Sequence, residues 1–226
     1  MKLTYYGHSC FSVQIGKEFL LFDPFITPNP LASHIKLKDI KADFILVSHG
    51  HSDHVADLIE LANSTGAKVI CSWEIYEWLN KQGVSNTHPM NTGGKWNFGG
   101  FKVKCVAAQH SSGLPDGSYG GNPLGFIVMC DECNFYYSGD TALTLDMQLI
   151  PNWAKLKFAV LPIGDNFTMD IADAAECARM IQCSTIVGVH YDTFGFIKID
   201  HDEAKSVFSK ARRQLHLIKI GESIDL

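Results

Sequence analysis

The sequence lacks an apolar stretch long enough to cross a membrane. None of its hydrophobic runs reaches the roughly 18 residues that a membrane helix needs. Its first residues, MKLTYYGHSCFSV, also lack the apolar segment and the small-residue cleavage site of a signal peptide. We therefore expect a cytoplasmic protein that has no membrane partner.

Positive charge is scarce as well. The chain has 19 Lys and Arg against 24 Asp and Glu, which gives a formal net charge of -5. This balance provides no general attraction to nucleic acid or to anionic membrane surfaces. We expect a small-molecule substrate and no nucleic-acid partner, and we leave open whether the chain forms a homo-oligomer.

Cysteine is too irregularly placed for a disulfide framework. The seven cysteines are odd in number and scattered, which is typical of free thiols in a reducing compartment. Cys130 and Cys133 form one CxxC motif, CDEC, but no second CxxC accompanies it. We therefore interpret CDEC as a tight turn between two strands and not as a zinc knuckle or a redox pair.

Length and patterning predict the architecture. At 226 residues and 46% hydrophobic, the chain is expected to form a single domain over residues 1–226. About eleven apolar runs rich in Val, Ile, Phe and Tyr predict strands. These runs span 3–6, 11–15, 19–22, 44–47, 68–71, 101–108, 124–130, 134–138, 158–163, 185–189 and 215–220.

Helical patterns lie between these runs, at 54–64, 73–82, 171–182 and 201–213. The early strands follow one another as hairpins and the later ones alternate with helices, which favours a mixed sheet, or two sheets, with helices outside. Trp73, Tyr76 and Trp78 have helical spacing and predict core packing. The Gly-, Ser- and Pro-rich segment 109–123 predicts a long exposed loop.

The motif SHGHSDH at 48–54 is the most informative feature of the sequence. It places His49, His51, Asp53 and His54 directly after the apolar run FILV. Imidazole and carboxylate groups suit zinc and similar divalent ions, and in a tight turn alternate side chains can face different ions. The motif cannot complete the coordination of two ions, so further ligands must come from distant parts of the chain.

Three candidates for these further ligands each follow an apolar run: His110, Asp140 and His190. Side chains at the ends of several strands can converge at one edge of a sheet. Each of these residues alone also fits a solvated or turn position. Together with the motif at 48–54 they predict a metal site.

The pattern HxHxDH, followed at increasing distance by His, Asp and His, resembles the metallo-β-lactamase superfamily. More narrowly, the chain is similar to a family of uncharacterised metal-dependent hydrolases related to ascorbate-phosphate lactonase. The resemblance implies an α+β fold, a four-layered αββα sandwich. The motifs that carry it are GHSCF at 7–11, DPF at 23–25, SHGHSDH at 48–54, HPMN at 88–91, HSS at 110–112, GNPLGF at 121–126, SGDT at 138–141, LPIGDNFTM at 161–169 and HYDTF at 190–194.

The resemblance also implies a role for each ligand. One divalent ion would be held by His49, His51 and His110, and a second by Asp53, His54 and His190, with Asp140 between them. Zinc is the expected metal and manganese the alternative. Related iron-dependent oxidoreductases carry glutamate at the position of His51, so histidine there favours hydrolysis.

The expected activity is cleavage of an ester, lactone or phosphodiester bond of a small molecule by a hydroxide bridging two metals. Asp53 is the expected catalytic carboxylate, and His8 would either protonate the leaving group or support a metal ligand. Asp23 would orient a ligand imidazole or cap a turn. Asn166, Thr168 and Met169 lie in a segment that resembles the family's pocket-lining loop.

Other functions stay open at this point. An RNA or nucleotide phosphodiesterase would use the same site, although the acidic charge balance disfavours it. A thioester hydrolase, a di-iron oxidoreductase and a metal-loaded scaffold protein are the remaining alternatives. Neither the substrate nor the native metal follows from these residues, because one fold and ligand set serve many reactions.

Overall fold

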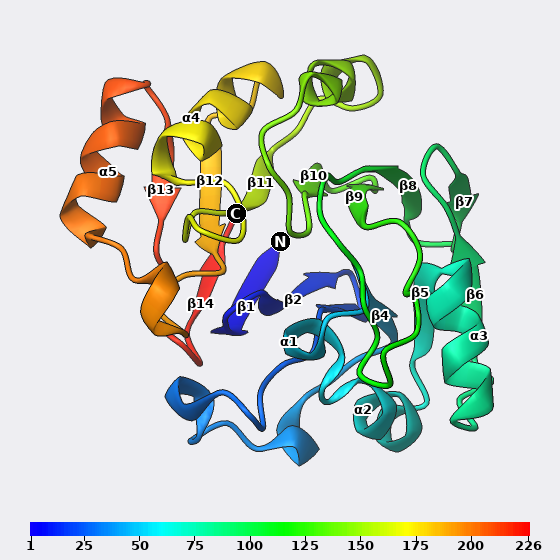
Figure 1. The fold of residues 1–226 in the computed structure, drawn as a ribbon. Coiled ribbons are helices and arrows are strands. Elements are labelled where there is room, and N and C mark those ends of the chain that lie inside the picture. Colours follow the sequence, from blue (N-terminus) through cyan, green and yellow to red (C-terminus); the bar gives the residue numbers. More distant parts are fainter.

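The structure is a computed structural model that describes residues 1–226. Two 7-stranded sheets form its centre, with the orders β14-β1-β2-β3-β4-β5-β6 and β13-β12-β11-β10-β9-β8-β7 (Figure 1). The first sheet contains β1 (Lys2–Gly7), β2 (Cys10–Ile15), β3 (Glu18–Phe22), β4 (Phe44–Leu46), β5 (Lys68–Ser72), β6 (Thr87–Met90) and β14 (Ser223–Asp225). The second contains β7 (Lys95–Asn97), β8 (Lys102–Ala107), β9 (Leu124–Met129), β10 (Asn134–Tyr137), β11 (Phe158–Pro162), β12 (Thr185–Val189) and β13 (Gln214–His216).

Both sheets are mixed in the same way. In the first sheet β14, β1, β2 and β3 are antiparallel neighbours, and β3 to β6 are parallel. In the second sheet β7 to β10 are antiparallel and β10 to β13 are parallel. The hairpins β1-β2, β2-β3, β7-β8 and β9-β10 all lie in the antiparallel halves of the sheets, whereas parallel neighbours require longer crossover connections.

Aromatic side chains fill the space between the two sheets. The rings of Phe11 and Phe22 stack at 4.5 Å, and Tyr137 of the second sheet packs edge-on against both. All three residues belong to a buried cluster contributed by both sheets. Aromatic rings bury large areas and favour stacked and edge-to-face contacts, so this cluster is expected to hold the two sheets together.

Helices cover the outer faces of both sheets (Figure 1). The first sheet carries α1 (Ser52–Val55), α2 (Leu58–Thr65) and α3 (Trp73–Lys81), and the second carries α4 (Ile171–Met180) and α5 (His201–Lys210). Short 3-10 helices lie at η1 (Pro30–Ala32), η2 (Leu37–Asp39), η3 (Leu145–Asn152) and η4 (Gly195–Ile197). The prediction of a four-layered αββα sandwich is confirmed.

Three strands that the patterning did not predict lie at sheet edges. They are β6, β7 and β14. Their sequences, THPM, KWN and SID, are short and have no continuous apolar run, because an edge strand has only one neighbour and is partly solvated. Pro89 fits in β6 because an edge strand needs hydrogen bonds on one side only. The predicted strand at 215–220 is shorter than expected and ends at His216.

The predicted helix at 54–64 is two helices, α1 and α2. Asp57 separates them, since its carboxylate accepts hydrogen bonds from the backbone N–H groups of Ile26 and Thr27 at 2.6 and 2.9 Å. Its own N–H donates to the carbonyl of Pro24 at 3.1 Å. These hydrogen bonds connect the loop after β3 to the segment that follows the HxHxDH motif.

Two local predictions are confirmed and one is partly wrong. CDEC forms the turn between β9 and β10, and all cysteines are free thiols. Segment 109–123 contains no strand apart from an isolated bridge between Gly113 and Tyr119. Trp78 packs in the core, but Trp73 is 52% exposed, because it begins α3 at the end of a strand. None of the helices combines the length and the apolar character that crossing a bilayer demands.

Candidate metal centre

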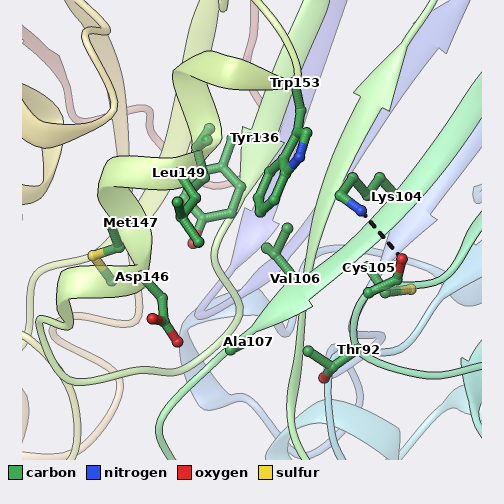
Figure 2. A pocket seen from close by; sticks show the side chains of 12 residues that line it. Thr92, Lys104, Cys105, Val106, Ala107, Tyr136, Asp146, Met147, Leu149 and Trp153 are labelled. Atoms are coloured by element: carbon green, nitrogen blue, oxygen red, sulfur yellow. Dashed lines mark hydrogen bonds between the residues drawn. The ribbon is translucent and has the colours of Figure 1, made fainter.

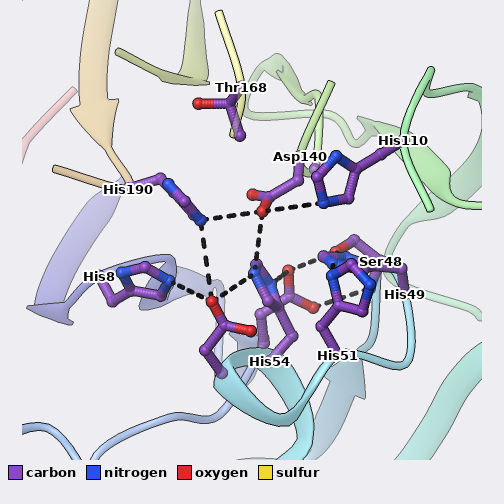
Figure 3. A network of polar contacts seen from close by, with 12 residues as sticks. His8, Ser48, His49, His51, His54, His110, Asp140, Thr168 and His190 are labelled. Carbon is purple, nitrogen blue, oxygen red and sulfur yellow. Dashed lines mark hydrogen bonds and ion pairs between the residues drawn. The ribbon is translucent and has the colours of Figure 1, made fainter. Parts of the chain in front are cut away.

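The predicted ligands all follow strands and meet at one end of the two sheets. The loops after β1, β3 and β4 carry His8, Asp23 and the SHGHSDH motif. The loops after β8, β10 and β12 of the second sheet carry His110, Asp140 and His190. Figure 3 shows the side chains of His8, His49, His51, His54, His110, Asp140 and His190 pointing toward one another from both sheets.

Three of these residues have a left-handed backbone conformation, which directs their side chains toward the cluster. His8, Asp23 and His190 have φ angles of +54°, +42° and +56°. Such angles are uncommon for residues other than glycine and cost free energy that the surrounding structure must offset. The N–H of His190 donates to the carbonyl of His8 at 2.9 Å, so two of the three turns support each other.

Glycine is required next to Asp140. Gly139 has a φ of +62°, and a Cβ atom there would lie 2.7 Å from the carbonyl oxygen of Leu124 and 2.8 Å from the Cβ of Ser48. No ordinary side chain fits this space without moving backbone. The SGD sequence therefore brings the Asp140 carboxylate close to the loop after β4.

Three imidazoles from distant segments face a single carboxylate oxygen. Oδ2 of Asp140 lies 2.9 Å from Nε2 of His190, 3.2 Å from Nε2 of His54 and 3.8 Å from Nε2 of His110. Asp140, His54 and His190 are almost fully buried, whereas the side chain of His110 is 14% exposed. This is the position between two ions that the resemblance implies for Asp140.

The other predicted ligands lie on either side of Asp140. Nε2 of His49 lies 2.9 Å from Nδ1 of His51, and the ligand atoms of His49, His51 and His110 lie within 4.8 Å of one another. The same holds for a second group that contains His8, Asp53, His54 and His190. The structure thus brings all seven predicted ligands together, and their role as ligands stays a prediction.

His8 contacts Asp53 and not the open space above the site. Its Nε2 lies 3.0 Å from Oδ2 of Asp53, and its Nδ1 lies 3.1 Å from the hydroxyl of Thr193. His8 is 1% exposed and does not line the cavity at the site. Of the two roles predicted for His8, this geometry favours support of Asp53 over protonation of a leaving group.

Asp23 forms a buried network beneath the cluster. Its Oδ2 lies 2.8 Å from Nδ1 of His54 and accepts hydrogen bonds from the hydroxyls of Ser48 and Tyr137 at 2.6 and 2.5 Å. Its Oδ1 accepts from the N–H of Ser48 at 2.7 Å. The oxygens of Asp23 are therefore occupied by donors, and the residue orients an imidazole instead of binding an ion directly.

This network determines which ring nitrogen carries the proton in the neutral forms of His54 and His49. An ionised carboxylate only accepts, so the proton of a neutral His54 sits on Nδ1 and its Nε2 carries a lone pair. Ser48 donates to Asp23, so its oxygen accepts from Nδ1–H of His49, and Nε2 of His49 is likewise a lone pair. Nε2 of His54 has no hydrogen-bond partner and Nε2 of His49 lies 2.9 Å from Nδ1 of His51, so both lone pairs face the cluster, as metal coordination requires.

A cation fits between these groups. Nε2 of His54 and Oδ1 of Asp140 are buried and have no hydrogen-bond partner. The lone pair of a neutral His54 would face Oδ2 of Asp140, which is another acceptor, at 3.2 Å. All the ion pairs of these carboxylates are with histidines, and none is with lysine or arginine. Divalent ions would supply the missing positive charge, and the donor set is one that zinc or manganese accepts.

The pKa directions agree with this requirement. Burial lowers the pKa of His49, His51 and His110, which keeps these imidazoles neutral. Burial opposes the charge of His54 too, but Asp140 and Asp23 outweigh it and raise the pKa of His54 well above its ordinary value. Positive charge is thus favoured at His54, where a proton and a metal ion would compete.

Burial also acts on the pair formed by His8 and Asp53. Burial and the neighbouring His190 lower the pKa of His8 to about 4, so its imidazole is neutral at physiological pH. Burial raises the pKa of Asp53, but the hydrogen bond from His8 and the proximity of His54 outweigh this and lower it overall. Asp53 is therefore a carboxylate that accepts a hydrogen bond from the Nε2–H group of His8.

A cavity of about 920 Å³ opens above the cluster. Five residues of the cluster line it and are called its floor: His51, Asp53, His110, Asp140 and His190. Aromatic residues that the sequence reasoning missed form its walls: Phe25, Phe167, Phe194 and Phe196. Single phenylalanines in loops carry no pattern that distinguishes them from other loop residues, although DPF and HYDTF contain two of them.

The predicted pocket-lining segment 166–169 contributes a different residue from those expected. Phe167 lines the cavity, whereas Asn166, Thr168 and Met169 do not. Met169 is 1% exposed and packs with the residues beneath α4, and Asn166 points outward into solvent. The segment does border the cavity, as predicted, but through the side chain of Phe167.

A second cavity, of about 170 Å³, lies between η3 and the outer face of β8 and β10 (Figure 2). Trp153 and Lys104 stand at one side, with Nζ of Lys104 4.6 Å from the ring centroid of Trp153. The buried hydroxyl of Tyr136 has no hydrogen-bond partner. This cavity contains no histidine, and the groups of side chains that could hold a metal ion lie at the strand ends instead.

Comparisons with known proteins agree with the fold and the cluster. Residues 19–191 match the beta-lactamase superfamily domain. Proteins named UPF0173 metal-dependent hydrolase from Christiangramia forsetii and Flavobacterium johnsoniae are 50% and 49% identical, and each match covers 100% of both chains. The structure of a metallo hydrolase from Ignicoccus hospitalis is 35% identical, with a TM-score of 0.89, over 99% of this chain and 97% of the other.

The chain therefore belongs to the beta-lactamase superfamily and has the metallo-β-lactamase fold. Within it, the chain is a member of the family of UPF0173 metal-dependent hydrolases.

Proposed function

We propose that the chain is a binuclear metal-dependent hydrolase that cleaves an ester, lactone or phosphodiester bond of a small molecule. The convergence of three imidazole nitrogens on Oδ2 of Asp140 is the observation that carries this proposal. One carboxylate oxygen facing several imidazole nitrogens would suit a position shared by two cations. Membership of a family of metal-dependent hydrolases supports the same reaction class.

The residues divide into two ligand groups around Asp140. His49, His51 and His110 would hold one ion, and Asp53, His54 and His190 would hold the other. When bound, divalent ions lower the pKa of a coordinated water and polarise the carbonyl or phosphoryl oxygen under attack. Zinc is the metal that this ligand set favours, and manganese is the alternative.

The protein groups around the ions have separate tasks. Asp53 lines the cavity floor, where its carboxylate can orient a water by accepting a hydrogen bond. His8 holds that carboxylate in place through Nε2. Asp23 and Ser48 keep the lone pairs of His54 and His49 directed at the site, and the phenylalanine walls limit the access of bulk water.

A small molecule suits the cavity better than a nucleic acid does. None of the residues that line it is lysine or arginine, and phosphate backbones are bound mainly by such side chains. The volume of about 920 Å³ lies within the range of small-ligand sites.

Metal analysis and a substrate panel test the proposal. We expect about two zinc or manganese ions per chain after purification without chelator. Chromogenic phosphodiesters, lactones and thioesters would then be assayed with the zinc and manganese forms. Turnover of at least one class, lost on chelation and restored by metal, is the expected result. Only trace metal in the purified protein, or no turnover of any class, would remove the proposal.

A further inference from the structure

Four phenylalanines surround the cavity in two pairs. The inner pair is Phe25 and Phe194, whose ring centroids lie 6.2 Å apart and which both contact the ring of His8. The outer pair is Phe167 and Phe196, whose centroids lie 6.3 Å apart in an edge-to-face arrangement. We refer to these four residues as the phenylalanine rim.

The outer pair is exposed to a degree that packing does not explain. Phe196 is 78% exposed and Phe167 is 48% exposed. Contiguous apolar surface of this kind at the mouth of a polar cavity commonly marks the binding site of an apolar group. The floor of the same cavity holds the proposed ligands, so a molecule seated on the rim would present its reactive bond to them.

Charges around the rim disfavour an anionic substrate. The cavity is lined by no lysine or arginine. The adjoining groove shares Phe196 with the cavity and contains Asp165, Asp170, Asp200 and Glu203 against the single cation Lys198. On the other side, the groove formed by the loop at 110–123 is lined only by histidine and by uncharged residues.

We propose that the substrate is an uncharged ester or lactone carrying an aromatic or similarly sized apolar group, which packs between Phe25 and Phe194 on one side and Phe167 and Phe196 on the other. This inference rests on the proposed hydrolase function and names its substrate class. A ring would gain contacts with aromatic faces and edges, whereas a carboxylate or a phosphate far from the metals would meet no compensating cation.

Methyl esters that differ only in the acyl group provide the first test. Methyl acetate, methyl 3-phenylpropanoate, monomethyl succinate and methyl 3-aminopropanoate supply a small, an aromatic, an anionic and a cationic acyl group with the same leaving group. Hydrolysis by the metal-loaded protein is followed by pH-stat titration. We expect kcat/KM for the phenyl ester to exceed that for acetate about tenfold, since apolar contacts discriminate by this order. The two charged esters should fall below the phenyl ester by a similar factor.

Variants of the phenylalanine rim test whether these residues cause the preference for the phenyl ester. Phe196→Ala should lower the ratio of kcat/KM for the phenyl ester to that for acetate about fivefold, and Phe196→Leu should restore part of it. Because Phe196 is largely solvent-exposed, its truncation is not expected to affect folding. Leu145→Ala is the matched control, since Leu145 is 75% exposed but lies outside the cavity. This control should leave the ratio unchanged.

Binding without turnover separates the two proposals. Saturation-transfer NMR with 3-phenylpropanamide, compared with its para-carboxylated analogue, reports occupation of the rim whether or not an ester is hydrolysed. Saturation-transfer signals from the phenyl protons that are weaker with Phe196→Ala than with the native protein support the inference. If these signals are seen but no ester is hydrolysed, only the proposed hydrolysis fails. Ester hydrolysis with no phenyl preference, or with preference for either charged ester, overturns the inference while the hydrolase function stands. Absence of both binding and phenyl preference also overturns it.

Discussion

Asp23 and His54 form a fully buried pair in which Oδ2 of the carboxylate lies 2.8 Å from Nδ1 of the imidazole. The same carboxylate oxygen accepts a hydrogen bond from Ser48, which in turn orients His49. Asp23 therefore determines, in His54 directly and in His49 through Ser48, which ring nitrogen carries the lone pair that faces the cluster. These two histidines belong to different proposed ligand groups.

Replacement of this carboxylate is expected to weaken metal binding. Asp23→Asn keeps the shape but turns one acceptor into a donor that faces His54, Ser48 or Tyr137. Loss of such a supporting contact typically lowers metal affinity by about 10- to 100-fold. Competition with a chromogenic chelator measures the change, and circular dichroism checks the fold. Asp225→Asn, on an exposed edge strand, is the control. Equal metal affinity in Asp23→Asn and the native protein would contradict the role given to Asp23.

Asp140 is expected to be required for both metal content and activity. Asp140→Asn removes the negative charge that faces His54, His110 and His190 while keeping nearly the same volume. We expect activity to fall at least about 100-fold and the metal content to drop, with a far-ultraviolet spectrum like that of the native chain. Asp146→Asn, an exposed carboxylate six residues further on, should change neither quantity. Native turnover by Asp140→Asn would exclude it from the metal centre.

The sequence predicted most of the cluster because chemistry-bearing residues directly follow apolar strands. His49, His51, Asp53 and His54 lie within one motif, so their proximity requires no knowledge of the tertiary structure. The convergence of His110 and His190 with that motif depends on the order of strands in two sheets, which local patterns do not contain. There the resemblance to a known superfamily was needed.

The features that sequence reasoning missed depend on context that a local pattern lacks. The edge strand β14 pairs with β1 at the other end of the chain, and the edge strands β6 and β7 are too short and too polar to stand out in the pattern. Thr193 and the phenylalanine rim lie in loops whose course is set by tertiary contacts, such as the hydrogen bond from His190 to the carbonyl of His8. Asp23 had two equal interpretations until the structure placed it against His54.

Thr193 is expected to act through His8. With Nε2–H of His8 donated to Asp53, Nδ1 can only accept, and the Thr193 hydroxyl at 3.1 Å is its donor, shared with the carbonyl of Tyr191 at 3.3 Å. Thr193→Val keeps the shape and removes this donor, so we expect kcat to fall about tenfold, within the range of lost supporting contacts at metal sites. Thr193→Ser retains the hydroxyl and should stay close to native. Steady-state kinetics with the best ester found tests this, and equal kcat values for Thr193→Val and Thr193→Ser would argue against it.

Substitution of Gly139, next to Asp140, is expected to destabilise the fold and to disturb the metal centre. Gly139→Ala places a Cβ 2.7 Å from the carbonyl oxygen of Leu124 at a φ of +62°, so it combines a clash with a strained backbone. The expected loss in the free energy of unfolding is about 3 kcal/mol. Gly83→Ala has a similarly left-handed φ of +84° but meets nothing within 4 Å, so it should cost only about 1 kcal/mol. Urea denaturation of both variants measures the difference. Since the clash also displaces the neighbouring Asp140, only Gly139→Ala should lose metal, and equal metal content in the two variants would show that the position of Asp140 does not depend on this glycine.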